Sequence, residues 1–143
     1  MIKIKNISAQ DTYEIRLIVL RKNIDLPYKF EGDNDKDTFH LGAFYQNELV
    51  GIATFMKNTI DSELEEQYQL RGMATLPKVR GKGAGKLLIE EAKRIIKEKG
   101  ISFLWCNARI EAVGFYESLN FKIIGEEFEV QKVGPHYKMV TKL

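Results

Sequence analysis

One stretch constrains the fold more than any other: "TLPKVRGKGAGKLLIEEAKRIIKEKG", from Thr75 to Gly100. Pro77 ends the strand-like run "QYQLRGMATL", and Gly100 follows a periodic segment in the way that glycine commonly ends a helix. The next run, "ISFLWC", is short and almost wholly apolar, as a strand buried on both faces would be. The chain therefore predicts a strand–helix–strand unit, whose two strands pair in parallel because a helix separates them.

The remaining segments predict antiparallel strands on either side of this unit. "IKIKNI" alternates apolar and polar residues, and Ser8 with Asp11 then opens a helix in a capping arrangement. The polar "DLPYKFEGDNDKD", broken by Pro27 and Gly32, is typical of a loop. After the loop come a hairpin, the strand–helix–strand unit, a helix over "RIEAVGFYESLN" from Arg109 to Asn120, and two closing strands. The predicted class is α/β (α+β), in the order β-α-β-β-β-α-β-α-β-β.

Length and charge exclude several classes of protein. At 143 residues we expect a single domain over residues 1–143. The 22 basic and 20 acidic residues are interleaved, which does not indicate a nucleic-acid partner. No apolar run approaches the length of a membrane span, and the N-terminus has no signal-peptide pattern. The single cysteine, Cys106, fits a reducing compartment, so we expect a cytoplasmic protein and no disulfide framework or metal site.

The centre of the long stretch, "RGKGAGK", has the composition of an anion-binding loop. Glycines before a helix let an anion approach unpaired amides, and the helix dipole favours negative charge there. A P-loop would need glycine at Arg80 and a hydroxyl at Leu87, and a dinucleotide fingerprint would need glycine at Lys86 or Leu88, so both patterns fail. The pattern [Arg/Gln]-x-x-Gly-x-[Gly/Ala] is met from Arg80 to Gly85. The plain alternative is a flexible helix start with solvated lysines.

On these residues the chain resembles the GNAT superfamily of acetyl-CoA-dependent N-acetyltransferases, as a small bacterial-type single-domain member. The loop and its flanks, "LRGMATLPKVRGKGAGKLL", are similar to the family's strand–loop–helix block. "EAVGFYESLNF" resembles its second block, and "VGPHYKM" the tail of many small members. The resemblance implies a mixed sheet of six to seven strands with helices on both faces and a splayed central parallel pair. It also implies acetyl transfer from acetyl-CoA to a primary amine by direct attack, with no acyl-enzyme.

The resemblance further implies how coenzyme A is held. Loop amides and basic side chains would meet the diphosphate, Met73 and Thr75 would pair with the pantetheine arm, and an amide near Met73 or Ala74 would stabilise developing negative charge. The implied cofactor-binding residues are Met73, Ala74, Thr75, Arg80, Gly81, Lys82, Gly83, Ala84, Gly85, Lys86, Asn107, Arg109 and Tyr116. The family often has asparagine where this chain has Arg109, and Asn107 is out of register, so either residue could take that role.

Two proton transfers need catalytic residues. Tyr116 lies where the family's tyrosine acid sits and would protonate the leaving thiolate; the plain alternative is a core aromatic beside Phe115 and Phe121. The amine must lose a proton, which for a lysine-like ammonium costs on the order of 4–5 kcal/mol at pH 7. Candidate bases are Glu65 and Glu66, directly or through water, and His136, since histidine ordinarily titrates near neutral pH. A solvated acidic connection and a structural histidine are the plain alternatives.

The acceptor is a small-molecule or peptide amine that the sequence does not identify. The family recognises acceptors through the loop after the first helix and the final hairpin, here "DLPYKFEGDNDKD" and "EEFEVQKVGPHY". Both are acid-rich, which favours a cationic amine. Homodimers are frequent in the family, and the sequence gives no sign for or against one. Two other functions stay open: a GNAT-fold acyl-CoA-binding sensor without turnover and, more weakly, a nucleotide-binding regulator.

Overall fold

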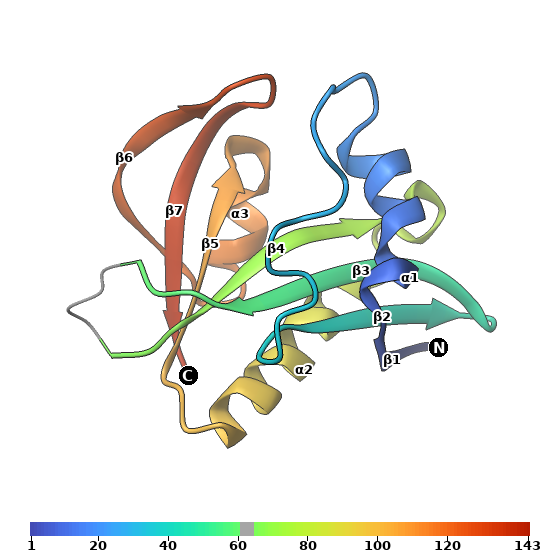
Figure 1. Ribbon diagram of the computed structural model, residues 1–143, viewed down its shortest axis with the longest axis horizontal. Helices are drawn as coiled ribbons and strands as arrows, with labels where there is room; N and C mark the ends of the chain where they lie inside the picture. Colours follow the sequence, from blue (N-terminus) through green and yellow to red (C-terminus); the bar gives the residue numbers. More distant parts are fainter. Residues whose placement is uncertain (61–64) are drawn as a thin grey trace.

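The computed structural model describes residues 1–60 and 65–143, which form a seven-stranded sheet with helices on both faces (Figure 1). The strands are β1 (Ile2–Ile7), β2 (Phe39–Tyr45), β3 (Glu48–Lys57), β4 (Tyr68–Thr75), β5 (Phe103–Arg109), β6 (Lys122–Val130) and β7 (Gly134–Lys142). The α-helices are α1 (Ala9–Ile15), α2 (Ala84–Glu98) and α3 (Val113–Glu117). A π-helical turn (Arg16–Leu20) continues α1, and 3₁₀ turns (Pro77–Val79 and Ile110–Ala112) precede α2 and α3.

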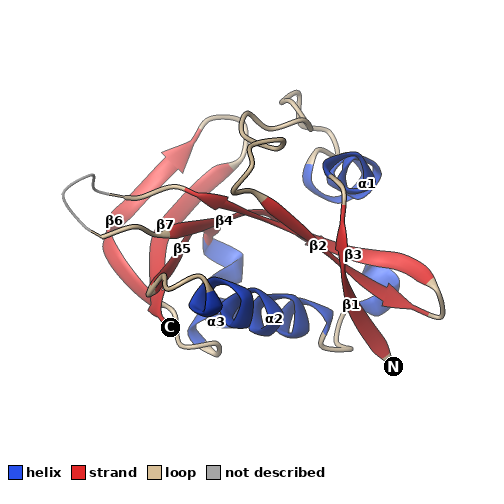
Figure 2. Cartoon of the chain, turned by 60° about the horizontal axis from the view of Figure 1, so that its bottom comes forward, coloured by secondary structure: helices blue, strands red, loops and turns tan. Residues whose placement is uncertain are grey.

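The sheet order is β1-β2-β3-β4-β5-β7-β6, and its central pair, β4 with β5, is parallel. All other neighbouring strands pair antiparallel, so the mixed sheet predicted from the element order is confirmed. The hairpin turn between β2 and β3 places Gln46 and Asn47 at φ of 51° and 66°, the left-handed pair that a tight two-residue hairpin requires. Figure 2 shows α1 on one face of the sheet and α2 with α3 on the other.

The main core lies between α2 and the sheet. Leu88, Ile89, Ala92 and Ile96 follow one stripe of the helix and are fully buried. The helix ends where the sequence predicts: Gly100 has a φ of 80°, its amide donates to the Lys97 carbonyl, and the Ile101 amide donates to the Ile96 carbonyl. This pair of bonds is a Schellman motif, which satisfies carbonyls that the helix end would leave free.

The two central strands diverge partway along their length, as the resemblance predicts. β4 and β5 pair only from Tyr68 opposite Leu104 to Leu70 opposite Cys106. Just beyond that point β4 contains a bulge against β3, because Arg71 faces Thr54 while Ala74 already faces Ile52. Gly72 lies inside this bulge with a φ of 61°. A bulge bends its strand, and here the bend accompanies the opening of a gap between β4 and β5.

The structure differs from the prediction at the end of β5. The apolar run suggested a strand ending at Cys106 and a helix starting near Arg109, but β5 continues to Arg109 and α3 begins at Val113. The polar residues stay extended because β7 pairs with β5 along its full length, up to Arg109 opposite His136. This extension carries Asn107 and Arg109 along the open side of the gap. No helix in residues 1–60 and 65–143 is both long and apolar enough to cross a membrane.

Candidate functional site

A first cavity, here called the loop cavity, lies at the start of α2. It has a volume of about 410 Å³ and is lined by Met73, Ala74, Thr75, Val79, Arg80, Gly81, Gly83, Ala84, Gly85, Lys86 and Phe115. Gly81 and Gly83 have φ values of 83° and 84°, and a Cβ at either would meet nothing within 4 Å. Glycine is therefore needed there for the backbone conformation and not for lack of room.

The backbone of the loop cavity carries free donors. The first bond of the helix runs from the Leu87 amide to the Gly83 carbonyl, so the amides of Ala84, Gly85 and Lys86 have no carbonyl one turn earlier to bond. The Lys82 amide is different, since it donates to the Val79 carbonyl. Three consecutive free amides at a helix N-terminus form a site for a phosphate-like anion.

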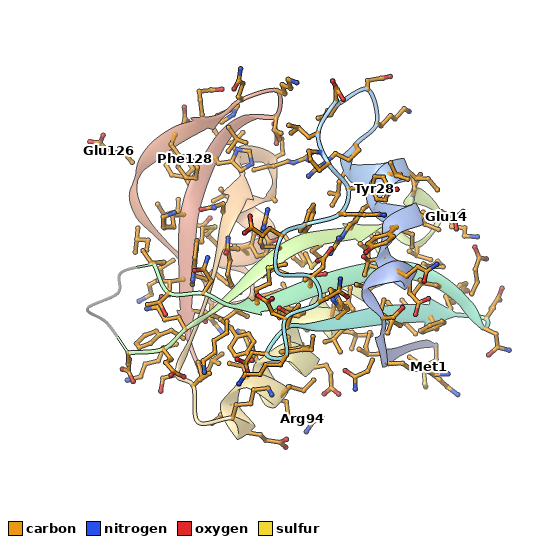
Figure 3. All side chains as sticks on the ribbon, in the orientation of Figure 1. Met1, Glu14, Tyr28, Arg94, Glu126 and Phe128 are labelled. Carbon is orange, nitrogen blue, oxygen red and sulfur yellow. The ribbon has the colours of Figure 1, made fainter. Side chains whose placement is uncertain are left out.

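A second cavity, here called the strand cavity, occupies the gap between the diverging strands. It has a volume of about 690 Å³, and Met73 lines both cavities, so the two adjoin. Its walls come from β4, β5, the segment from Leu20 to Glu31, and the β6–β7 hairpin. Figure 3 labels Tyr28, in the segment from Leu20 to Glu31, and Phe128, on the β6–β7 hairpin. The two segments expected to recognise the acceptor thus contribute to one cavity.

Tyr116 lines the strand cavity and also packs on its aromatic neighbours. Its ring meets Phe115 and Phe121 edge to face, with centroids 5.2 and 5.3 Å away, and the residue is 8% exposed. Burial, and secondarily the neighbouring Cys106, raise the pKa of the Tyr116 phenol above its usual range. The phenol therefore keeps its proton at neutral pH and can act as a donor.

His136 lines the same cavity from β7. Its Nδ1 lies 2.8 Å from the Gly134 carbonyl oxygen, which can only accept, so Nδ1 carries the proton. In a neutral ring Nε2 is then the nitrogen with a free lone pair. The side chain is buried at 6% exposure and its ring lies 5.8 Å from that of Phe128. A neutral His136 would therefore offer Nε2 as a proton acceptor in a residue that lines the cavity.

Three arginines from distant parts of the chain also line the strand cavity: Arg21, Arg71 and Arg109. Arg21 donates to the carbonyls of Pro27 and Leu20, and Arg109 reaches the Leu20 carbonyl at 3.5 Å. Within the described residues none of the three forms an ion pair with a carboxylate. They form a concentrated positive charge without a direct carboxylate partner among the described residues.

The arginines influence one another electrostatically. Burial, followed by the charges of Arg109, Arg71 and Arg16, lowers the pKa of the Arg21 guanidinium. Burial and the Arg16 charge likewise lower the pKa of Arg71. Among the acidic residues of the two recognition segments only Glu31 lines the cavity, whereas Glu126 points outward at the edge of the molecule (Figure 3). The cavity does not share the acidity of its rims, which removes the ground for expecting a cationic acceptor.

Comparison with known proteins identifies the family. The model of the acetyltransferase (GNAT) domain matches residues 19–143. An uncharacterized N-acetyltransferase of Bacillus subtilis strain 168, YitI, is 39% identical over 145 residues, which cover all of this chain and 97% of YitI. The chain belongs to the GNAT acetyltransferase family. GNAT proteins use an acyl-CoA donor, and membership makes this chain an acyltransferase.

Solved GNAT structures share the fold. Escherichia coli ElaA superposes with a TM-score of 0.82 at 19% identity, with 99% of each chain covered. An aminoglycoside 6'-N-acetyltransferase complexed with coenzyme A superposes with a TM-score of 0.77 at 13% identity, covering 98% of this chain and 96% of its own. The GNAT fold and the superfamily resemblance stated from the sequence are both confirmed.

The structure brings most of the predicted GNAT site residues to the two cavities. The loop cavity takes Met73, Ala74, Thr75, Arg80, Gly81, Gly83, Ala84, Gly85 and Lys86, and the strand cavity takes Asn107, Arg109, Tyr116 and His136. Lys82 lines neither: its amine lies 5.3 Å from the centre of the Tyr45 ring. Asn107 accepts a hydrogen bond from Lys138 at 3.0 Å. Cys106 lines the strand cavity, and burial raises its pKa to about 12, so it stays a thiol and no nucleophile.

Glu65 and Glu66, the predicted carboxylate bases, lie at neither cavity. Both are exposed, and Glu66 pairs with Lys57 at 3.0 Å. They precede the end of β4 that is paired with β5, whereas the strand cavity opens at the far end of that strand. The sequence did not predict that Arg21, Arg71 and Phe115 line the cavities. Arg21 and Arg71 lie outside the glycine-rich motif, and Phe115 was expected only as a core aromatic.

Proposed function

We propose that this GNAT protein transfers the acetyl group of acetyl-CoA directly, without an acyl-enzyme, to a primary amine on a small molecule or peptide that also carries an anionic group. The observation that supports it is the set of three arginines, without carboxylate partners among the described residues, in the cavity that holds Tyr116 and His136. A carboxylate or phosphate on the acceptor would satisfy their donors bidentately. A cytoplasmic location belongs to the proposal and suits the buried free thiol of Cys106.

The residues present fit coenzyme A. The free amides of Ala84, Gly85 and Lys86, with the side chains of Arg80 and Lys86, would hold the diphosphate. Beyond Leu70 the edge of β4 has no pairing with β5, so its backbone groups are available to the amides of the pantetheine arm. When bound, the coenzyme supplies a thioester whose carbonyl carbon is open to an amine.

The chain's own residues would then handle the protons. His136 Nε2 accepts a proton from the acceptor ammonium, directly or through water, because its Nδ1 is occupied by Gly134. Tyr116 keeps its phenolic proton at neutral pH and gives it to the leaving sulfur. Met73 lines both cavities and Ala74 lines the loop cavity, and a backbone amide of either residue would stabilise negative charge that develops on the thioester oxygen.

The test uses acceptors that differ in a single charged group. Release of free coenzyme thiol is measured with acetyl-CoA for two pairs: glycine against glycinamide, and O-phosphoethanolamine against ethanolamine. The proposal predicts that kcat/KM is higher for the anionic member of a pair, because only that member pairs with the arginines. A consistent preference for the neutral members would refute the anionic acceptor. Tight acetyl-CoA binding without transfer to any amine would favour an acyl-CoA sensor instead.

A further inference from the structure

The segment that precedes β2 is fastened to the sheet by a buried ionic group. Arg16 is fully buried, and its guanidinium donates to both carboxylate oxygens of Asp33 at 2.7 and 3.0 Å. It also donates to the Tyr28 carbonyl at 2.9 Å and to the Thr54 hydroxyl at 2.8 Å. Arg16 opens the π-helical turn, in which the Arg21 amide donates to the Arg16 carbonyl. Such turns are frequent at functional sites.

The donor and acceptor of each hydrogen bond among Arg16, Thr54, His40 and Asp33 can be assigned. The Asp33 carbonyl, 2.9 Å from His40 Nε2, can only accept, so Nε2 carries the imidazole proton. Nδ1 then accepts from the Thr54 hydroxyl at 2.7 Å, and the hydroxyl oxygen accepts from Arg16. Burial lowers the pKa of His40, in agreement with a neutral ring. Both Thr54 and Asp33 join Arg16 to His40, and Thr54 does so through its single hydroxyl group.

Phe30 connects the network to the strand cavity, which it lines. The Asp33 carboxylate accepts from the Phe30 amide at 2.9 Å. The Phe30 ring centre lies 3.9 Å from the Arg16 guanidinium carbon and 4.6 Å from that of Arg71. A Cβ on Gly72 would come within 2.7 Å of the same ring, so the bulge glycine gives the ring its place. Thr54 is moreover the direct cross-strand neighbour of both His40 and Arg71.

We propose that Thr54, with Arg16, Asp33 and His40, positions Phe30 and thereby holds Arg71 in place to bind the anionic group of the acceptor. This inference rests on the proposed function. A buried ion pair often adds no more stability than well-packed apolar residues of similar volume, so a gain in stability is weak grounds for the network. The network instead fixes the geometry of the loop that carries Phe30, and the Phe30 ring supports Arg71.

The experiment compares T54V, which keeps the volume of Thr54 and removes its hydroxyl, with T54S, which keeps the hydroxyl. T141V, at a buried threonine on β7, is the control for loss of a buried hydroxyl elsewhere. Two quantities are measured on the full chain saturated with coenzyme A, which fills the diphosphate site. The first is amide hydrogen exchange at Asp33, Asp35 and Thr38, whose amides bond within the loop, with the α2 amides as reference. The second is the affinity for inorganic phosphate.

In T54V we expect exchange at these loop amides to rise about tenfold with α2 unchanged, and phosphate affinity to fall about tenfold, as for a lost hydrogen bond to a charged group. T54S and T141V should behave as the unmodified chain does. F30L should lower the affinity for phosphate without changing amide exchange at Asp33. This variant replaces T54V as the test if T54V does not fold.

Each other outcome has a distinct meaning. If T54V matches T141V in both measurements, or raises exchange in α2 as much as in the loop, the positioning role is refuted. If the unmodified chain binds no phosphate, the anionic acceptor fails, while the loop exchange still decides whether the network anchors the segment.

Discussion

Neutralising Arg71 should make the unliganded protein more stable, and the structure sets the size of the effect. The guanidinium carbons of Arg16 and Arg71 lie 3.9 and 4.6 Å from the same ring centre. They are therefore at most about 8.5 Å apart, where two unit charges repel by about 2 kcal/mol at an effective dielectric constant of 20. Asp33 cancels part of this repulsion, and loss of the Phe30 contact costs about 0.5–1 kcal/mol. R71M should then gain about 1 kcal/mol, or about 2–4 °C in Tm.

The assay is thermal and urea unfolding of the unmodified chain and R71M, with and without inorganic phosphate. Phosphate stabilises proteins generally, but binding at the arginines adds a term that R71M should lack. The control is R94M, because Arg94 is an exposed arginine that bonds Glu91 and Glu98 and so has no repulsion to relieve. If R71M is less stable than the unmodified chain, the prediction is wrong. Arg71 would then make a stabilising contact within the protein and would not be available to a ligand.

Three further results should follow. Y116F should lower kcat about 10²–10⁴-fold with little change in the KM for acetyl-CoA, because it removes a proton donor and no binding group; unchanged turnover would exclude the acid role. Below pH 6.5 His40 takes up a proton in the unfolded chain but resists it when buried in the folded one. The free energy of unfolding should therefore decrease as the pH is lowered, by up to about 1.4 kcal/mol per pH unit, and should decrease less in H40Q. Equal slopes for the two proteins in urea unfolding would argue against the lowered pKa of His40. G83A should cost about 1–2 kcal/mol through its left-handed backbone, whereas G114A, equally open but with ordinary φ, should cost less, and equal costs would contradict the strain.

The sequence by itself determined the element order and the glycine-rich loop before α2. Those features are local: glycines at 81, 83 and 85, the stop at Pro77 and the cap at Gly100 act on their immediate neighbours. The apolar run up to Cys106 located β5 for the same reason. The end of β5 was missed because its last residue, Arg109, pairs with His136 of β7, which is distant in the sequence. Local pattern gives no information on a partner strand that is distant in sequence.

Only the tertiary structure decided which side chains line the strand cavity. Arg21, Arg71 and Arg109 are separated by tens of residues, and the bulge at Gly72 and the divergence of β4 from β5 bring them together. The acidic residues that dominate the two rim segments are mostly exposed, so composition gave the wrong sign for the cavity. The physical reason is that charge in a cavity depends on which side chains point inward, and that is fixed by register and loop anchoring rather than by counts along the chain.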